Sequence, residues 1–77
     1  MIDFDAKDAV LEKHSVTISG HRTSISLEKL FWDHLKTFAK QDQITIADLI
    51  RQIDEARGGS LSGALRVYVL RRLLQKT

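Results

Sequence analysis

Two short stretches near the start of the chain alternate between polar and apolar residues. They are HSVTIS at residues 14–19 and RTSISL at residues 22–27, and both are rich in β-branched residues and serine. Such alternation is typical of strands that bury one face and expose the other. The pattern therefore predicts two strands that are joined near Gly20.

The parity of the apolar positions predicts that these strands form a hairpin. Val16 and Ile18 are even-numbered, whereas Ile25 and Leu27 are odd-numbered, so one continuous strand would place the two pairs on opposite faces. A two-residue turn that begins at Gly20 brings all four onto one face, and glycine suits the first position of a type II′ turn. A β-bulge at Gly20 would have the same effect. The hairpin is the preferred interpretation.

The position of the turn also predicts the pairing of the strands. A turn at residues 20–21 places Ser19 opposite Arg22 and Val16 opposite Ile25. The polar face of the hairpin would then hold Ser15, Thr17, Ser19, Arg22, Ser24 and Ser26. Alternation alone does not decide whether this face is a solvated surface or a binding surface, since serine and threonine suit both.

After the second predicted strand, the apolar residues recur with a helical period. The apolar stripe comprises Leu27, Phe31, Leu35 and Phe38, at intervals of three and four residues. It predicts a helix over about residues 28–41, with Ser26 as its N-cap. Trp32 lies beside this stripe, and we expect it to pack against a later helix or a second copy of the chain rather than on a nucleic-acid base.

Two further helices follow. Thr45 is the expected N-cap of the second, which should end near Arg57 with the glycine pair 58–59 as its C-cap. Ser60 or Ser62 is the expected N-cap of the third. The sequence thus predicts a mainly helical domain with a short β element.

The third helix carries more apolar residues than one stripe requires. Leucines, valines and a tyrosine surround most of its circumference between residues 61 and 74. We therefore expect it to be buried on more than one side, against a second subunit. Arg66 lies among these apolar residues, and Asp54 or Glu55 is its expected partner.

Length and composition favour an oligomer. A chain of 77 residues is at most one domain and buries a small core, although 43% of its residues are hydrophobic. It has no cysteine, so disulfides cannot supply the missing stability. The spacing of His14, His21 and His34 matches no metal site, and we expect no cofactor.

Charge is distributed unevenly along the chain, although the net charge is only +2. Residues 1–13 hold four acids against two lysines and are expected to form a flexible acidic arm. Residues 14–77 hold ten lysines and arginines against six acids, a balance that suits a polyanionic partner. No stretch is long and apolar enough to span a bilayer, and the start lacks a signal-peptide pattern. We expect a cytoplasmic protein without membrane contact.

The predicted strand at residues 22–27 has an edge that its own chain leaves unpaired. Exposed edges of this kind pair with another chain unless they are blocked. The simplest partner is a second copy related by a two-fold axis, which would give an intertwined homodimer.

Residues 22–53, RTSISLEKLFWDHLKTFAKQDQITIADLIRQI, resemble the ribbon-helix-helix DNA-binding domain of the Arc and methionine repressors. Over residues 14–74 the chain is similar to short bacterial ribbon-helix-helix proteins with an added C-terminal helix, and GHRTSISLE is the most specific part of this similarity. The resemblance implies a homodimer whose β-ribbon enters the DNA major groove. It leaves open whether the ribbon has two strands or four.

The resemblance also assigns roles to individual residues. Arg22, Ser24 and Ser26 match the strand positions that contact base edges, and arginine and serine are chemically suited to that task. Thr45, with the backbone N–H groups of Ile46 and Ala47, matches the anchor for a DNA phosphate at the start of the second helix.

These expectations lead to two alternative functions. The first is a sequence-specific DNA-binding transcriptional regulator, a repressor that occupies a short palindromic operator. The second is a dimeric protein-interaction module, such as an antitoxin-type protein, that uses the arm at residues 1–13 or the third helix to bind a partner. No nucleophile elbow, carboxylate pair or phosphate loop points to an enzyme.

Overall fold

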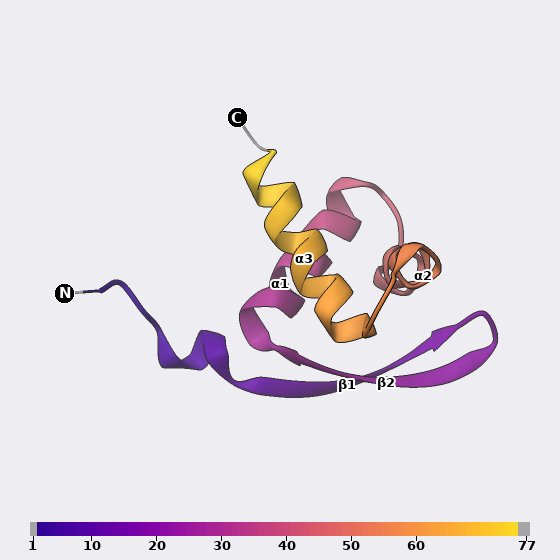
Figure 1. Cartoon of the computed structure of the whole chain (residues 1–77), viewed down its shortest axis with the longest axis horizontal. Coiled ribbons are helices and arrows are strands. Elements are labelled where there is room, and N and C mark those ends of the chain that lie inside the picture. The colour runs from indigo at the N-terminus through magenta and orange to yellow at the C-terminus, as the bar shows by residue number, and fades with distance from the viewer. Residues whose placement is uncertain (1, 76–77) are drawn as a thin grey trace.

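The chain forms a β-hairpin, and three helices pack against one face of it (Figure 1). A computed structural model describes residues 2–75. The elements in chain order are a short 3₁₀ helix η1 (Ala6–Ala9), strands β1 (Leu11–Ile18) and β2 (His21–Glu28), and helices α1 (Lys29–Gln41), α2 (Ile46–Ala56) and α3 (Leu61–Leu74). The predicted class, mainly helical with a short β element and an added third helix, is confirmed.

The hairpin turns one residue earlier than the sequence pattern suggested. Ile18 lies opposite His21, so Ser19 and Gly20 form the turn. Their φ angles are 51° and 82°, and positive φ at both central residues defines a type I′ turn, whose twist matches that of the strands. The expected type II′ turn at residues 20–21 is therefore wrong, and so is the expected pairing of Ser19 with Arg22. Thr17 lies opposite Arg22 instead.

The faces of the hairpin are nevertheless as predicted. The observed register differs from the expected one by two residues, and a shift of two keeps every side chain on its own face. Val16, Ile18, Ile25 and Leu27 all point toward the helices and are buried or half-buried. Pairing runs without interruption from the turn to the far ends of both strands, so the alternative of a bulge at Gly20 is also wrong.

Strand β1 begins at Leu11, three residues before the predicted start. A further backbone hydrogen bond, from Lys29 N–H to the carbonyl of Val10 (2.9 Å), extends the pairing to the first residue of α1. Residues 11–13, which had been expected in the acidic arm, therefore belong to the sheet. Ahead of them, η1 is capped by Asp5, whose carboxylate accepts a hydrogen bond from Lys7 N–H.

The helix caps follow the sequence signals at two of three helices. The hydroxyl of Thr45 accepts a hydrogen bond from Asp48 N–H, and that of Ser60 accepts one from Gly63 N–H, both at 3.0 Å. Ser26 is not the cap of α1, because β2 continues to Glu28 and the helix begins without a side-chain cap. Helix α2 ends at Ala56, and the next residue is already extended, so the glycine pair 58–59 lies in the loop rather than forming a C-cap.

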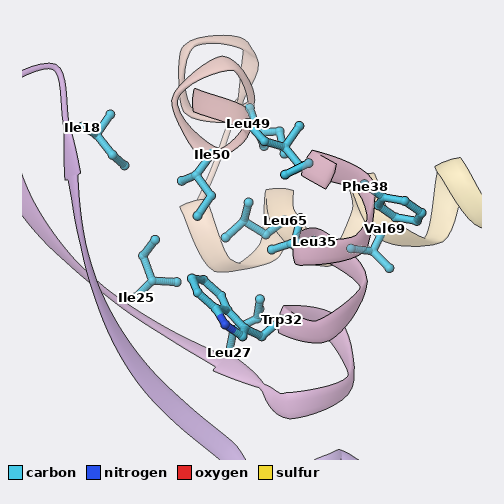
Figure 2. Close-up of a cluster of buried hydrophobic side chains, with 12 residues drawn as sticks. Ile18, Ile25, Leu27, Trp32, Leu35, Phe38, Leu49, Ile50, Leu65 and Val69 are labelled. Atoms are coloured by element: carbon cyan, nitrogen blue, oxygen red, sulfur yellow. The ribbon is translucent and has the colours of Figure 1, made fainter. Parts of the chain in front are cut away.

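All three helices and both strands contribute to one hydrophobic core (Figure 2). The fully buried side chains are Leu27, Leu35, Ile50, Leu65 and Val69. Two of these five belong to α3, so the added helix is part of the same domain as the hairpin and the first two helices. The core lies between the helices and the inner face of the hairpin, and it leaves the outer face uncovered.

Two side chains make contacts that the sequence pattern did not predict. The indole of Trp32 stacks on the imidazole of His14 in β1, with ring centroids 3.7 Å apart and nearly parallel planes, and it belongs to the same buried cluster as Leu65 and Val69 of α3. The guanidinium of Arg66 donates two hydrogen bonds to Glu28, at 2.9 and 3.2 Å, instead of pairing with Asp54 or Glu55. Both differences arise because the hairpin extends alongside α1 and brings its own polar residues to the helices.

Candidate nucleic-acid interface

The hairpin surface that faces away from the helices, here called the outer face, is polar. Odd-numbered residues of β1 and even-numbered residues of β2 point outward, as their greater exposure shows. The polar members of the outer face are Lys13, Ser15, Thr17, Arg22, Ser24 and Ser26. The structure thus brings the three predicted base-contacting residues of β2 onto one surface and places three polar residues of β1 beside them.

Arg22 is held across the hairpin. Its Nε donates a hydrogen bond of 3.0 Å to the hydroxyl of Ser15. Arg22 lies directly opposite Thr17, and Ser15 is two residues away from Thr17 on β1, so this bond crosses the hairpin diagonally. Both side chains are exposed. The bond uses only one of the five N–H groups of arginine, so the two terminal nitrogens remain available for a bidentate contact.

Ser24 and Ser26 continue the polar row toward the base of the hairpin. Ser24 is exposed and lies opposite Ser15, while Ser26 is half-buried and lies opposite Lys13. The backbone carbonyl of Ser26 accepts a hydrogen bond from the hydroxyl of Ser62 in α3, at 2.9 Å. This contact fixes the end of the strand against the added helix and leaves the Ser26 side chain on the outer face.

Lys13 is a cation of the outer face that the sequence pattern did not reveal. It was expected in the acidic arm because the alternation of β1 is interrupted by Glu12 and His14, which are polar but lie on the inner face. Lys13 could have been predicted from the alternation of the strand, because the outward-facing positions recur every second residue and continue from Thr17 and Ser15 to residue 13. With Arg22, it gives the outer face two positive charges in each chain.

Among the residues of the two strands, the only acidic one with outer-face parity is Glu28, at the end of β2. Hydrogen bonds from the guanidinium of Arg66 hold the pKa of this carboxyl below its usual range. The pair is partly exposed, and the positive charge of Arg66 offsets the negative charge of Glu28. The serines, threonine and two cations of the outer face are therefore not opposed by a free carboxylate.

The predicted phosphate anchor lies elsewhere. Thr45, Ile46 and Ala47 form the start of α2, which packs against the inner side of the hairpin. The hydroxyl of Thr45 is used to cap Asp48 N–H, while the first N–H groups of a helix have no partner within it. The structure therefore does not join these three residues with the outer face in one cluster, and it presents them as a separate helix N-terminus.

Arg72 has a structural role that its sequence position did not reveal. Its guanidinium donates two hydrogen bonds of 2.7 Å to the carboxylate of Asp42 and one of 2.8 Å to the hydroxyl of Tyr68. It also lies 4.4 Å from the centre of the Phe38 ring. These contacts raise the pKa of Arg72, lower that of Asp42, and fasten the end of α3 to the end of α1.

An apolar surface remains open on α3. Val67, Leu70 and Leu74 are 57%, 56% and 72% exposed, and Leu30 of α1 is 44% exposed. Part of this surface is a groove of about 220 Å³ between α1 and α3. The sequence pattern predicted that α3 is buried on more than one side, against a second subunit, and this surface is open in the single chain.

The described residues offer neither a metal-binding cluster nor a membrane-spanning helix. Within residues 2–75, no three histidine, aspartate or glutamate side chains come together in a group that could hold a metal ion. In the same part of the chain, every helix is too short or too polar to cross a lipid bilayer.

Comparison with known proteins gives a family and a structural relative. No curated protein matches the chain. A solved structure, described as an uncharacterized protein from Bordetella pertussis Tohama I, is similar with a TM-score of 0.79 and 26% identity. The similarity covers 92% of this chain but only 62% of that protein, so the chain spans less than two thirds of its relative's length.

The family match agrees with the order of elements described above. The profile of the ribbon-helix-helix domain matches residues 11–73, from the first residue of β1 almost to the end of α3. Domains of this family are typically non-enzymatic modules that bind DNA as transcription regulators and form dimers. Because the match covers most of the chain, the protein belongs to the ribbon-helix-helix domain family.

Proposed function

We propose that the protein is a sequence-specific DNA-binding transcriptional regulator, a bacterial cytoplasmic repressor that acts as a homodimer. The observation that carries this proposal is the outer face of the hairpin. It presents Arg22, Ser24 and Ser26 in one row, beside further hydroxyls and Lys13, with no free carboxylate to repel a phosphate backbone. A polar, positively charged ribbon of this kind suits the major groove.

The homodimer would form at the free edge of β2. The sheet has only two strands within residues 2–75, so β2 pairs with β1 on one side and offers its other side to a second chain. Antiparallel pairing of β2 with its copy would produce a four-stranded sheet with β1 on both flanks. The open apolar surface of α3 is consistent with further burial on assembly.

Each predicted contact has a chemical role in this arrangement. Arg22 can bind the O6 and N7 atoms of guanine with its terminal nitrogens, and the hydroxyls of Ser24 and Ser26 can donate to or accept from any base edge. Thr45, with the N–H groups of Ile46 and Ala47, would bind a backbone phosphate and set the register of the dimer. Two-fold symmetry makes the operator approximately palindromic, and repression follows from its occupation.

Fluorescence anisotropy with labelled duplexes tests the proposal. An operator is first selected from a random-sequence library by the wild-type protein, and binding to it is compared with binding to a randomised duplex. Arg22→Ala should reduce the preference for the operator by roughly 10-fold or more, because a bidentate arginine contributes about 1–3 kcal/mol of base discrimination. Arg71→Ala is the matched control, since Arg71 is an exposed arginine in the half of α3 that runs away from the sheet (Figure 1).

Equal preference in Arg22→Ala and wild type would refute the role of the outer face in base recognition. The variant should remain folded, because the side chain is exposed and its one hydrogen bond is to another exposed residue, Ser15. Sedimentation of both variants checks that the oligomeric state is unchanged.

A second candidate function is the dimeric protein-interaction module of the antitoxin type. The exposed apolar surface of α3 favours it, because contiguous apolar patches often mark binding sites for other proteins. A dimeric wild-type protein that binds no duplex at about 50 mM salt would support this candidate over DNA binding. The arm is then tested by removing only residues 1–9, since Val10 already pairs with Lys29.

A further inference from the structure

We propose that β1 is a phosphate-binding strand and that Lys13 is its contact with the DNA backbone. This inference rests on the proposed function and concerns how the flanking strands of a four-stranded sheet meet a duplex. A two-stranded ribbon fits within the major groove, and the hairpin adds one strand on each side of it. The added strands need a place on the DNA, and their residues indicate which one.

Strand spacing places β1 over the wall of the groove. Neighbouring strands lie about 4.8 Å apart, so in the dimer each β2 lies about 2.4 Å from the two-fold axis and each β1 about 7 Å from it. The major groove is about 12 Å wide, which gives a half-width of about 6 Å. The β2 pair therefore lies over the bases, while β1 lies over the phosphates that border the groove.

The charges of β1 fit this location. Lys13 points outward from the hairpin and is exposed, and it makes no ion pair within residues 2–75. Its neighbour in sequence, Glu12, faces the inner side and contacts His14 at 3.3 Å. The carboxylate of Glu28 at the same end of the hairpin is bound to Arg66. The Lys13 ammonium is therefore free to bind an anion.

Lys13 and Arg22 occupy opposite ends of the outer face. Lys13 lies opposite Ser26, and Arg22 opposite Thr17, which corresponds to four residues along β1 or about 13 Å. Lysine is a compact point charge with no preferred plane, whereas arginine matches the paired acceptors of guanine. The chain thus places the less specific cation on the flanking strand and the more specific one on the central strand.

The salt dependence of DNA binding tests this division. Each phosphate contact contributes about 0.9 to the slope of log affinity against log salt, so Lys13→Gln, which removes two contacts per dimer, should reduce the slope by about 1.8. Between about 50 and 200 mM salt, its affinity for a randomised duplex should then fall about 12-fold less than that of the wild type. Lys13→Arg should keep the slope, and Arg71→Gln, which removes the same charge from α3, should keep it as well.

The preference for a selected operator over the randomised duplex separates the possible outcomes. Lys13→Gln should leave this preference unchanged, while Arg22→Ala should lose it. A wild-type slope in Lys13→Gln would overturn the inference, and the proposed function would stand as long as Arg22→Ala loses its preference. A loss of preference in Lys13→Gln would also overturn it, because Lys13 would then contact bases. Failure of the wild type to bind any duplex would refute the proposed function together with the inference.

Discussion

Substitution of Ser19 by asparagine should stabilise the protein, because the turn places Ser19 in the left-handed region. Its φ is 51°, a conformation that costs non-glycine residues about 1–2 kcal/mol. Asparagine occurs there several-fold more often than an average residue, which corresponds to about 0.6–1 kcal/mol. Ser19 is exposed and makes no side-chain hydrogen bond within residues 2–75, so no tertiary contact is lost.

Urea unfolding followed by far-UV circular dichroism measures this effect at a fixed protein concentration, since assembly would otherwise change the apparent stability. A gain of about 0.8 kcal/mol with a slope of about 1.5 kcal/mol per molar raises the midpoint by about 0.5 M. Ser24→Asn is the matched control, because Ser24 is an exposed strand residue without a side-chain hydrogen bond within residues 2–75, and asparagine is disfavoured in strands. A lower midpoint for Ser19→Asn would refute the type I′ turn and favour a turn at residues 20–21, in which Ser19 is a strand residue.

Two further predictions concern the second turn residue and an ion pair. Gly20→Ala should lower the free energy of unfolding by about 1–2 kcal/mol, because Gly20 has a φ of 82° that alanine adopts only with strain. Gly58→Ala is the control, since Gly58 is equally free of neighbouring atoms but has no left-handed φ, and it should raise the free energy of unfolding by about 0.4–1 kcal/mol. Parallel urea titrations compare the two variants, and equal effects would contradict the assigned turn. Because hydrogen bonds from Arg66 lower the pKa of Glu28, the stability that this pair adds is present above the ordinary value of 4.5 and is lost as the pH falls through the lowered pKa. Arg66→Met should flatten that acid limb in a series of thermal melts, and an unchanged limb would show that the pair adds no pH-dependent stability.

The faces of the hairpin could be predicted from the sequence, but its register could not. Apolar parity places Val16 and Ile25 on the same side in either register, because a shift of two residues exchanges no faces. The choice depends on the turn, and Gly20 can serve in both a type I′ and a type II′ turn. The two turns differ in the left-handed conformation of Ser19, which cannot be predicted from the fact that the residue is a serine.

The candidate site was predictable on β2 and in part on β1, where only Lys13 was missed. On β2, apolar residues alternate cleanly with Arg22, Ser24 and Ser26. On β1, the first two inward positions are Glu12 and His14, so the polar–apolar contrast disappears where Lys13 lies. These polar residues are tolerated on the inner face because His14 stacks on Trp32 and contacts Glu12, which no periodicity can show.

The sequence predicted helix caps correctly where the capping bond is local, and it failed where tertiary contacts determine the structure. Thr45 and Ser60 bond to residues three positions later, so the pattern of the local sequence is sufficient. Ser26 looked equally suitable, but pairing with Lys13 keeps it in β2. Glu28, the partner of Arg66, is 38 residues away in sequence, and the spacing of residues along one helix cannot predict a contact over that separation.

The pairing of β2 with β1 of its own chain reduces the ordering of the backbone that association of two chains would require. In a ribbon built from one strand per chain, each strand becomes ordered only when the two chains meet, and the entropy of ordering opposes their association. Here β1 orders and twists β2 beforehand, and the hydrogen bond between Val10 and Lys29 ties both strands to the first turn of α1. In the homodimer that we propose, a second copy would therefore meet a preorganised edge, and dimerisation would be the docking of two folded surfaces rather than a folding reaction of two chains.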